Sequence, residues 1–507
     1  MNPDLLRQST VTNLMKKENL ALIVIVCLAF FLRFWDIGWN GFNGDESIYS
    51  GQAASLLGEK EYLKDFAIFR AHPLLVQSMV SLAFVLFGIQ DVVARIIPVI
   101  FGSLTVYLTY LVGRELFDKR TALICSLILA IMPFHIIFSR QVILDVPLSF
   151  FVILFLYFVA RYRMTGRNIF CYWIGVSCGL CILSKEVGAI MIAIFIAYTL
   201  ITRTLNLNKL KLFGLGFISS FFPFILLMVT KHEFRDSIYY YGIFQFSRGE
   251  VNIFSPRYSN VLIHEAFGYV LILLMAISVF FIWRHSRILK SRRYLDGIIL
   301  LVLTLSTLFV CYQLLPSKGD RFMITFVPPA VILGCSFLVL DPLKRSDKRI
   351  LAYVSIIPLV VLSNNFFLSK ALPVEDLQIS DNLGTPWKRE VAMWIKDNTQ
   401  EDSAILTDHM PLANIIRFYS NRDVFTVEVS SNPSYIDVDN PALLILNKNI
   451  TLMVQDLDPK FSSNRLNLEL EKYVEFFDPK LAYTAYRQET TNGTSNSIPA
   501  MKVYQMR

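Results

Sequence analysis

Charged residues are scarce in this sequence. Asp, Glu, Lys and Arg make up 17% of its 507 residues, while hydrophobic residues make up 54%. A soluble domain carries a larger charged share because its surface faces water. The scarcity of charge therefore excludes an ordinary soluble globular domain and indicates the membrane class.

Cysteine is also scarce, and its positions exclude a disulfide framework in the loops. Cys178 and Cys181 have the spacing of a redox or metal pair, but no His or further Cys accompanies them. We interpret this pair as small residues at a contact between helices. All seven cysteines lie inside apolar runs: Cys27, Cys125, Cys171, Cys178, Cys181, Cys311 and Cys335.

Motifs for nucleotide-driven or redox chemistry are missing. The sequence has no histidine-pair zinc motif, no Walker loop and no dinucleotide fingerprint. The metal requirement stays unknown, with a divalent cation as a possible cofactor. The formal charge of +8 comes from basic residues in short clusters between apolar runs, which is typical of topology signals. We therefore expect no nucleic-acid partner.

Long apolar runs are abundant. A helix that crosses the hydrocarbon core needs about 20 apolar residues. One further run, Pro73–Gly88, is shorter, with about 16 residues or about 24 Å of helix. Eleven convincing runs lie near 19–35, 92–113, 121–139, 147–160, 168–184, 187–202, 212–230, 266–283, 295–315, 322–340 and 350–368.

The basic loops decide the topology. If Pro73–Gly88 does not cross the membrane, every strongly basic short loop falls on one side, as the positive-inside rule requires. If it does cross, all but the N-terminus move to the outside. We therefore predict an α-helical polytopic protein of the cell (plasma) membrane with about 11 transmembrane helices. The N-terminus is then cytoplasmic and the C-terminus outside.

This topology divides the chain into two domains. Residues 1–369 form a transmembrane domain whose first outer loop, 36–91, contains juxtamembrane helices. Residues 370–507 form an extracytoplasmic domain, in which an amphipathic helix is expected at Trp387–Asp397 and another helix after Pro411. The alternation of helices and strands predicts a small α/β domain. Strand-like runs lie at Ala404–Leu406, Val424–Val429 and Ala442–Leu446.

An acidic pair, Asp45–Glu46, lies on the predicted outer side. Both residues belong to the segment Asn43–Tyr49, at the start of a predicted short helix. Gly44 leaves the backbone free to bend, so a carboxylate can be directed at a bound group. The alternative is a structural one, because acidic residues are also favoured in the first turn of a helix. The local pattern leaves both open.

A second acidic candidate, Asp145, lies on the same side. It precedes Pro147 at the mouth of a membrane helix, where an ionisable group is costly unless it is paired or functional. The structural alternative is a helix cap with Arg140 as the partner. Because the topology brings Asp145 to the side of Asp45 and Glu46, we favour a functional role.

Six cationic or titratable side chains share this side. Each alone is more often an anchor at the membrane interface. Together they suit a phosphate group at headgroup depth, which Arg binds with two hydrogen bonds and Lys as a point charge. We expect them to bind an anionic lipid. They are Arg70, His72, Arg140, Lys185, Lys318 and Arg321.

A series of motifs resembles the GT-C class of glycosyltransferases, which use lipid-linked sugars. The branch with the strongest resemblance contains protein O-mannosyltransferases and the lipid A aminoarabinose transferase. The order and spacing of the motifs carry the resemblance, more than any single piece. The motifs are Gly44–Tyr49, His72–Leu74, Phe87–Gly88, Ala94–Pro98, Gly113–Phe117, Ser139–Leu148, Gly179–Lys185 and Pro316–Arg321 with Pro328.

The resemblance implies a GT-C fold and an inverting transfer of a sugar from a polyprenyl- or dolichyl-phosphate donor to an acceptor hydroxyl on the extracytoplasmic side. It assigns the catalytic base to Asp45 and matches Glu46 and Asp145 to the other acids of the family site. The implied partners are the lipid-linked donor, membrane lipid, and a glycan, lipid or protein acceptor.

Two departures from the family pattern limit these implications. The segment Arg70–Pro73 lacks the Glu–Lys–Pro–Pro pattern of the aminoarabinose branch, which leaves its metal site in doubt. The C-terminal region has no repeat resembling the extra domain of eukaryotic protein mannosyltransferases, so a protein acceptor is not implied. The alternative function is a transporter or flippase for a lipid-linked glycan, which should show internal repeats. No clear repeat is present.

Overall fold

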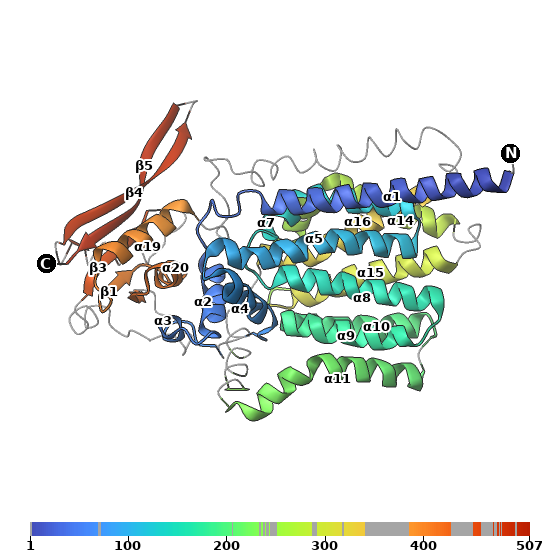
Figure 1. Ribbon diagram of the computed structural model, residues 1–507, viewed down its shortest axis with the longest axis horizontal. Coiled ribbons are helices and arrows are strands. Elements are labelled where there is room, and N and C mark those ends of the chain that lie inside the picture. Colours follow the sequence, from blue (N-terminus) through green and yellow to red (C-terminus); the bar gives the residue numbers. More distant parts are fainter. Residues whose placement is uncertain are drawn as a thin grey trace.

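The structure is a computed structural model with a long helical bundle and a smaller sheet-containing domain at one end (Figure 1). The predicted span 350–368, the predicted strand Ala442–Leu446, Arg70 and Lys318 lie outside the described residues. The structure describes residues 3–68, 72–204, 206–232, 235–236, 239, 243, 251–285, 292–316, 319–339, 385–426, 450–457, 470, 474–475, 477, 479–491 and 494–506.

The bundle helices run along the long axis of the molecule (Figure 1). They are α1 (Pro3–Phe34), α5 (Asp91–Leu116), α6 (Lys119–Ile131), α7 (Pro133–Phe138), α8 (Asp145–Thr165), α9 (Ile169–Ser184), α10 (Ile190–Ile201), α11 (Leu207–Thr230), α14 (Gly268–His285), α15 (Arg292–Gln313) and α16 (Val327–Cys335). Short segments between them are α13 (Arg257–Asn260), η1 (Glu186–Ala189), η2 (Val261–Phe267), η3 (Asp320–Phe326) and η4 (Ser336–Val339).

Six helical segments are long and apolar enough to cross a membrane, within the part of the chain that the structure describes. The predicted number of about 11 is therefore not confirmed, although the protein is mostly helical and integral to the membrane. Two of the predicted spans form shorter apolar helices, at Ile169–Ser184 and Glu186–Ile201. The six are Asp91–Leu116, Asp145–Thr165, Leu207–Thr230, Arg257–Phe281, Tyr294–Gln313 and Asp320–Leu338.

A break at Pro133 separates α6 from α7. Pro133 has no N–H to donate to the carbonyl of Leu129, four residues earlier, and this carbonyl accepts a longer bond from the N–H of Met132 instead (3.4 Å). Arg33, fully buried at the end of α1, donates to the carbonyls of Leu129 (3.1 Å) and Ala130 (3.0 Å). A cation suits this position because the C-terminal end of a helix carries partial negative charge. The chain is thereby free to turn into α7 and the loop before Asp145.

Two helices stay at the end of the bundle that faces the smaller domain. Helix α2 (Gly44–Ser55) runs across this end, with α4 (Leu75–Phe87) beside it (Figure 1). The 13 residues of α4 give about 20 Å of helix, less than the hydrocarbon thickness of a bilayer. The short α3 (Lys60–Leu63) lies between them in the chain. The helices α5 and α8 also begin at this end, where the predicted site residues that the structure describes lie.

The C-terminal domain contains a five-stranded sheet in the order β2-β1-β3-β5-β4. Strands β1 (Ala404–Thr407), β2 (Asp423–Thr426) and β3 (Ile450–Asp456) are parallel, while β4 (Lys480–Thr491) and β5 (Thr494–Gln505) form an antiparallel hairpin that extends past the sheet (Figure 1). The α/β prediction for this region is confirmed.

Two helices pack with this sheet. They are α19 (Pro386–Asn398) and α20 (Met410–Ser420). Val391 and Ile395 are fully buried on α19, and Trp394 stacks on Tyr483 with ring centroids 5.0 Å apart. These three residues form the apolar face expected from the sequence.

Candidate active site

Helix α2 begins with a capping box that fixes its first turn. The Asn43 side chain accepts a hydrogen bond from the Glu46 N–H (2.9 Å), and the Glu46 carboxylate accepts one from the Asn43 N–H (3.1 Å). These bonds satisfy N–H groups near the helix start. The structural alternative for the acidic pair thus describes Glu46, whose side chain takes part in the cap.

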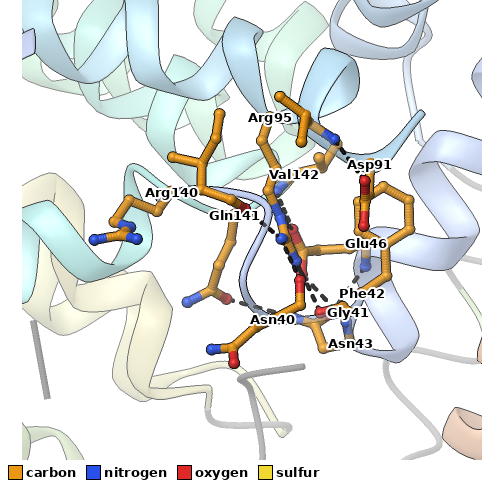
Figure 2. A network of polar contacts seen from close by, with 12 residues as sticks. Asn40, Gly41, Phe42, Asn43, Glu46, Asp91, Arg95, Arg140, Gln141 and Val142 are labelled. Carbon is orange, nitrogen blue, oxygen red and sulfur yellow. Dashed lines mark hydrogen bonds and ion pairs between the residues drawn. The ribbon is translucent and has the colours of Figure 1, made fainter. Parts of the chain in front are cut away.

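The Glu46 carboxylate is also paired with Arg95 on α5 (Figure 2). Arg95 donates from Nε and Nη2 to the two carboxylate oxygens, each at 2.8 Å. The N–H of Val142 donates to the same carboxylate at 3.0 Å. Glu46 is 0% exposed. Both oxygens of Glu46 are thus occupied inside the protein, and its side chain does not face the solvent.

Arg95 extends this network to the loop before α2. Its Nη1 donates to the carbonyls of Ile37 (2.7 Å) and Asn40 (2.6 Å), and its Nη2 donates to that of Gly41 (2.8 Å). One buried guanidinium thus fixes both the loop and the helix that carries Asp45. Arg95 lies in the motif Ala94–Pro98 but was not predicted as a site residue, although an arginine inside an apolar run is itself a signal, since it must find partners.

Asp45, the neighbour of Glu46, points to a different set of residues. Its carboxylate pairs with Arg321 of η3, and 38% of its side chain is exposed. Arg321 also faces Asp145 at the start of α8, with Nε 3.6 Å from the carboxylate. The structure therefore brings together Asp45, Asp145 and Arg321, as the sequence topology predicted.

Lys185 completes this cluster. Its Nζ lies 2.7 Å from the carboxylate of Asp145 and 3.8 Å from the centre of the Phe322 ring. The Asp145 side chain is only 2% exposed, so its charge is held between Lys185 and Arg321 away from water. A buried carboxylate requires such partners. Asp145 is thus a structural anchor for two cations, whereas Asp45 keeps an exposed side.

Burial and the nearby cations shift the pKa of Asp45 in opposite directions. Burial alone would raise the pKa of this carboxyl group, but the charge and hydrogen bond of Arg321, with a further contribution from Lys185, hold it below its usual range. Asp45 is therefore ionised at neutral pH, as a proton acceptor must be.

His72 lies next to this cluster. Its Nδ1 is 3.0 Å from both carboxylate oxygens of Glu186, and its ring meets that of Tyr49 edge-on with centroids 5.9 Å apart. Tyr49 lies one turn after Asp45 on α2. The sequence placed His72 among the phosphate-binding residues but did not identify Glu186 as its partner.

Arg140 is the remaining described cation of the predicted set. Its Nη2 donates to the carbonyl of Asp36 at 3.1 Å, and Figure 2 shows its side chain pointing away from the Glu46–Arg95 pair. The structure thus connects Arg140 to the first loop. The interpretation of Arg140 as a partner of Asp145 is not supported by the ion pairs of Asp145, which involve Lys185 and Arg321.

The described residues contain no group of three or more His, Cys, Asp and Glu side chains that could hold a metal ion. Asp45 and Asp145 are bridged by the guanidinium of Arg321 instead of facing one another.

The whole chain has the fold of the GT-C glycosyltransferases. The structure of ArnT from Cupriavidus metallidurans bound to undecaprenyl phosphate superimposes with a TM-score of 0.65, at 17% identity, covering 96% of this chain and 97% of that chain. The oligosaccharyltransferase AglB from Archaeoglobus fulgidus, in complex with an inhibitory peptide and a dolichol-phosphate, gives a TM-score of 0.57 at 15% identity, covering 95% and 74%. The fold implied by the sequence motifs is therefore confirmed.

A family model is matched by part of the chain. Residues 71–227 match the model described as dolichyl-phosphate-mannose-protein mannosyltransferase. A protein from Aquifex aeolicus, described as uncharacterized, is 24% identical over 390 residues, which cover 71% of this chain and 72% of that protein. The matched region begins beside His72 and contains Asp145 and Lys185, so it includes part of the cluster described above.

Proposed function

We propose that this protein is a membrane glycosyltransferase that moves a sugar from a polyprenyl- or dolichyl-phosphate donor to an acceptor hydroxyl, with inversion at the anomeric carbon. The observation that carries the proposal is the contact of Asp45 with Arg321, at the end of a bundle with the GT-C fold. The contact combines an ionised, partly exposed carboxylate with a cation that can bind phosphate. The family match and the lipid phosphates in the two similar structures support the donor class.

The side of the membrane follows from charge. The helix connections at the far end of the bundle contain Lys119, Arg120 and Arg167, and the positive-inside rule makes that end cytoplasmic. The Asp45 end of the bundle and the C-terminal domain then lie on the extracytoplasmic side of the cell membrane.

Asp45 acts as the general base. A hydroxyl is a poor nucleophile until its proton is removed, and a correctly placed base contributes about 10²–10⁴-fold to the rate. The acceptor oxygen forms a bond with the anomeric carbon as its proton moves to Asp45. The bond between that carbon and the phosphate oxygen breaks, and its electron pair leaves with the lipid phosphate. No covalent enzyme intermediate is needed in this inverting scheme.

Arg321 connects donor binding to this base. In the structure, Arg321 pairs with Asp45. A donor phosphate competes for the same guanidinium, because both are anions that Arg binds well. When phosphate takes Arg321, Asp45 loses its strongest partner and becomes available to the acceptor. Asp145 keeps Arg321 and Lys185 in place, so the growing charge on the leaving phosphate meets preorganised cations.

The remaining residues have supporting roles. His72 contributes to the binding of the donor phosphate, and Glu186 orients its ring through Nδ1. Glu46 and Arg95 position the loop and do not take part in proton transfer. The acceptor could be a glycan, a lipid or a protein.

The test uses the purified full chain in vesicles with a labelled polyprenyl-phosphate sugar. We expect wild-type protein to release polyprenyl phosphate with transfer of the label to an acceptor. Asp45→Asn should lower kcat by about 10²–10⁴-fold. Donor binding should remain or become tighter, because Arg321 is no longer shared. Asp36→Asn, the same chemical change in the same loop at an exposed position, serves as the matched control.

Two results would contradict the proposal. Full transfer by Asp45→Asn would exclude Asp45 as the base. Movement of the intact lipid-linked sugar between leaflets, without release of polyprenyl phosphate, would indicate the transporter or flippase instead.

A further inference from the structure

The C-terminal domain holds the loop that precedes Asp45. On α19, Arg389 Nη1 donates to the carbonyl of Gly38 (2.9 Å) and to the carboxylate of Asp91 (2.8 Å), the first residue of α5. This arginine thus joins the start of the loop to the start of a bundle helix from outside the bundle.

Tyr419 of α20 makes a second link. Its hydroxyl oxygen accepts a hydrogen bond from the N–H of Phe42 (2.9 Å), and the hydroxyl donates to Asp91 (3.3 Å). Phe42 immediately precedes Asn43, the cap of α2, and its ring packs edge-on against Phe418 with centroids 4.9 Å apart. The N–H before the cap is therefore fixed by a side chain of the C-terminal domain.

Two glycines allow these contacts. A Cβ on Gly41 would lie 2.7 Å from Cβ of Arg389, and one on Gly44 would lie 2.9 Å from Cα of Pro411. Real Cβ atoms do not come so close, so only glycine permits this approach. Gly44 directly precedes Asp45, which places the beginning of α20 against the turn that carries the proposed base.

The loop is thus held from two sides. Arg95 binds its carbonyls from the bundle, while Arg389 and Tyr419 bind it from the C-terminal domain. The supporting helices are themselves fixed to the sheet. Lys388, beside Arg389, pairs with Asp456 at the end of β3 (2.9 Å), and His409 at the start of α20 lies 3.2 Å from the same carboxylate. A continuous series of contacts therefore connects the sheet to the loop before Asp45.

We propose that Tyr419 and Arg389 are positioning residues for Asp45, so that the C-terminal domain sets the orientation of the base. The inference rests on the proposed function. Neither residue contacts Asp45; each acts through the backbone of residues 38–42. A displaced base slows the chemical step, and a misplacement of about 1 Å can cost about 10²-fold. Donor binding depends on Arg321 and Lys185, which these variants leave unchanged.

The main experiment compares Tyr419→Phe with wild type in the full chain. The variant removes both hydrogen bonds but keeps the ring. We expect kcat to fall about 10-fold, while the donor KM stays within about twofold. Tyr483→Phe is the matched control, because its hydroxyl donates to exposed Glu390 and not to the loop or Asp91, and it should keep wild-type kcat. A structural role alone would lower the amount of folded protein without changing kcat per folded molecule.

A second pair of variants tests Arg389. Arg389→Gln removes the charge near Asp91 and should lower kcat by a similar factor. Arg389→Lys keeps that charge and should restore part of the rate. Wild-type kcat for both Tyr419→Phe and Arg389→Gln would overturn the proposal.

Hydrogen exchange gives a readout that does not depend on transfer. Tyr419→Phe should speed amide exchange in residues 40–49, and Tyr483→Phe should not. Unchanged exchange in Tyr419→Phe would overturn the positioning role even with an inactive wild-type protein. If Tyr419→Phe speeds exchange but the wild-type protein transfers no sugar, the proposed function is wrong, whereas the support of the loop by Tyr419 is confirmed.

Discussion

Asp45 and Glu46 are neighbours in the chain with opposite surroundings. The Glu46 side chain is 0% exposed and both its oxygens are occupied, whereas the Asp45 side chain is 38% exposed and pairs with Arg321. Successive residues on a helix lie about 100° apart, because a turn contains 3.6 residues. Two adjacent residues of α2 thus differ in role: the Glu46 carboxylate stabilises the fold, whereas the Asp45 carboxylate is exposed enough to react.

The largest expected effect on stability comes from removing the buried acid. Glu46→Gln removes the main counter-charge of the Arg95 guanidinium, and breaking a buried ion pair in this way costs about 3–5 kcal/mol. Asp45→Asn should change the free energy of unfolding far less, because Arg321 keeps Asp145 as a partner. Thermal unfolding in detergent measures both variants. Equal losses in the two would remove the distinction between the neighbours.

A double variant sharpens this test. Arg95→Met should also be destabilising on its own, since it leaves the Glu46 carboxylate buried and unpaired. Glu46→Gln combined with Arg95→Met should lose less than the sum of the single losses, because the charge pair is removed as a unit. Additive losses would mean that the two side chains act independently.

The second prediction concerns pH. Arg321 is the main group that lowers the pKa of Asp45, and burial acts in the opposite direction. Arg321→Gln should therefore raise this pKa. Because the proposed mechanism requires ionised Asp45, the acid limb of kcat/KM should move to higher pH, while wild type stays active to lower pH. The pH profile of the residual transfer measures this shift.

Arg257→Gln is the matched control for this pH shift. Arg257 pairs with Asp320, the residue before Arg321, at 2.8 Å. The substitution removes the same charge from the same end of the bundle and should leave the acid limb in place. An unshifted limb in Arg321→Gln would show that Asp45 does not control it.

The smallest effect is expected from an exposed pair. Lys64 of the first loop pairs with Asp423 of β2, with side chains 65% and 36% exposed. Such pairs contribute about 0.2–1 kcal/mol and weaken with salt. Lys64→Met should therefore lower the free energy of unfolding by less than about 1 kcal/mol, and only at low salt. If Lys64→Met lowered the free energy of unfolding as much as Glu46→Gln, side-chain exposure would not predict how strongly an ion pair stabilises this protein.

The sequence predicted that Asp45, Asp145, Lys185 and Arg321 share one end of the bundle, because spans and basic loops determine sidedness. The sequence could not show which of Asp45 and Glu46 is buried, since this depends on which face of α2 meets Arg95. The contacts of Tyr419 were equally inaccessible, because they join segments 377 residues apart.

The hairpin of β4 and β5 was missed for another reason. An Asn–Gly dipeptide at 492–493 separates two runs that contain alternating apolar residues, and this dipeptide is a strong hairpin signal. The hairpin could therefore have been predicted from the sequence, whereas the contacts of Tyr419 could not. Helix α19 was predicted because Val391, Trp394 and Ile395 recur with the helical period.

The bond between Phe42 and Tyr419 has a consequence for biosynthesis. Chains are made at about 5–20 residues per second, so roughly 20–75 seconds separate the synthesis of these two residues. During this interval the loop before Asp45 has Arg95 but not its second support. If Tyr419 and Arg389 position Asp45 as proposed, a nascent chain with all its described membrane helices in place still lacks this support until the C-terminal domain folds.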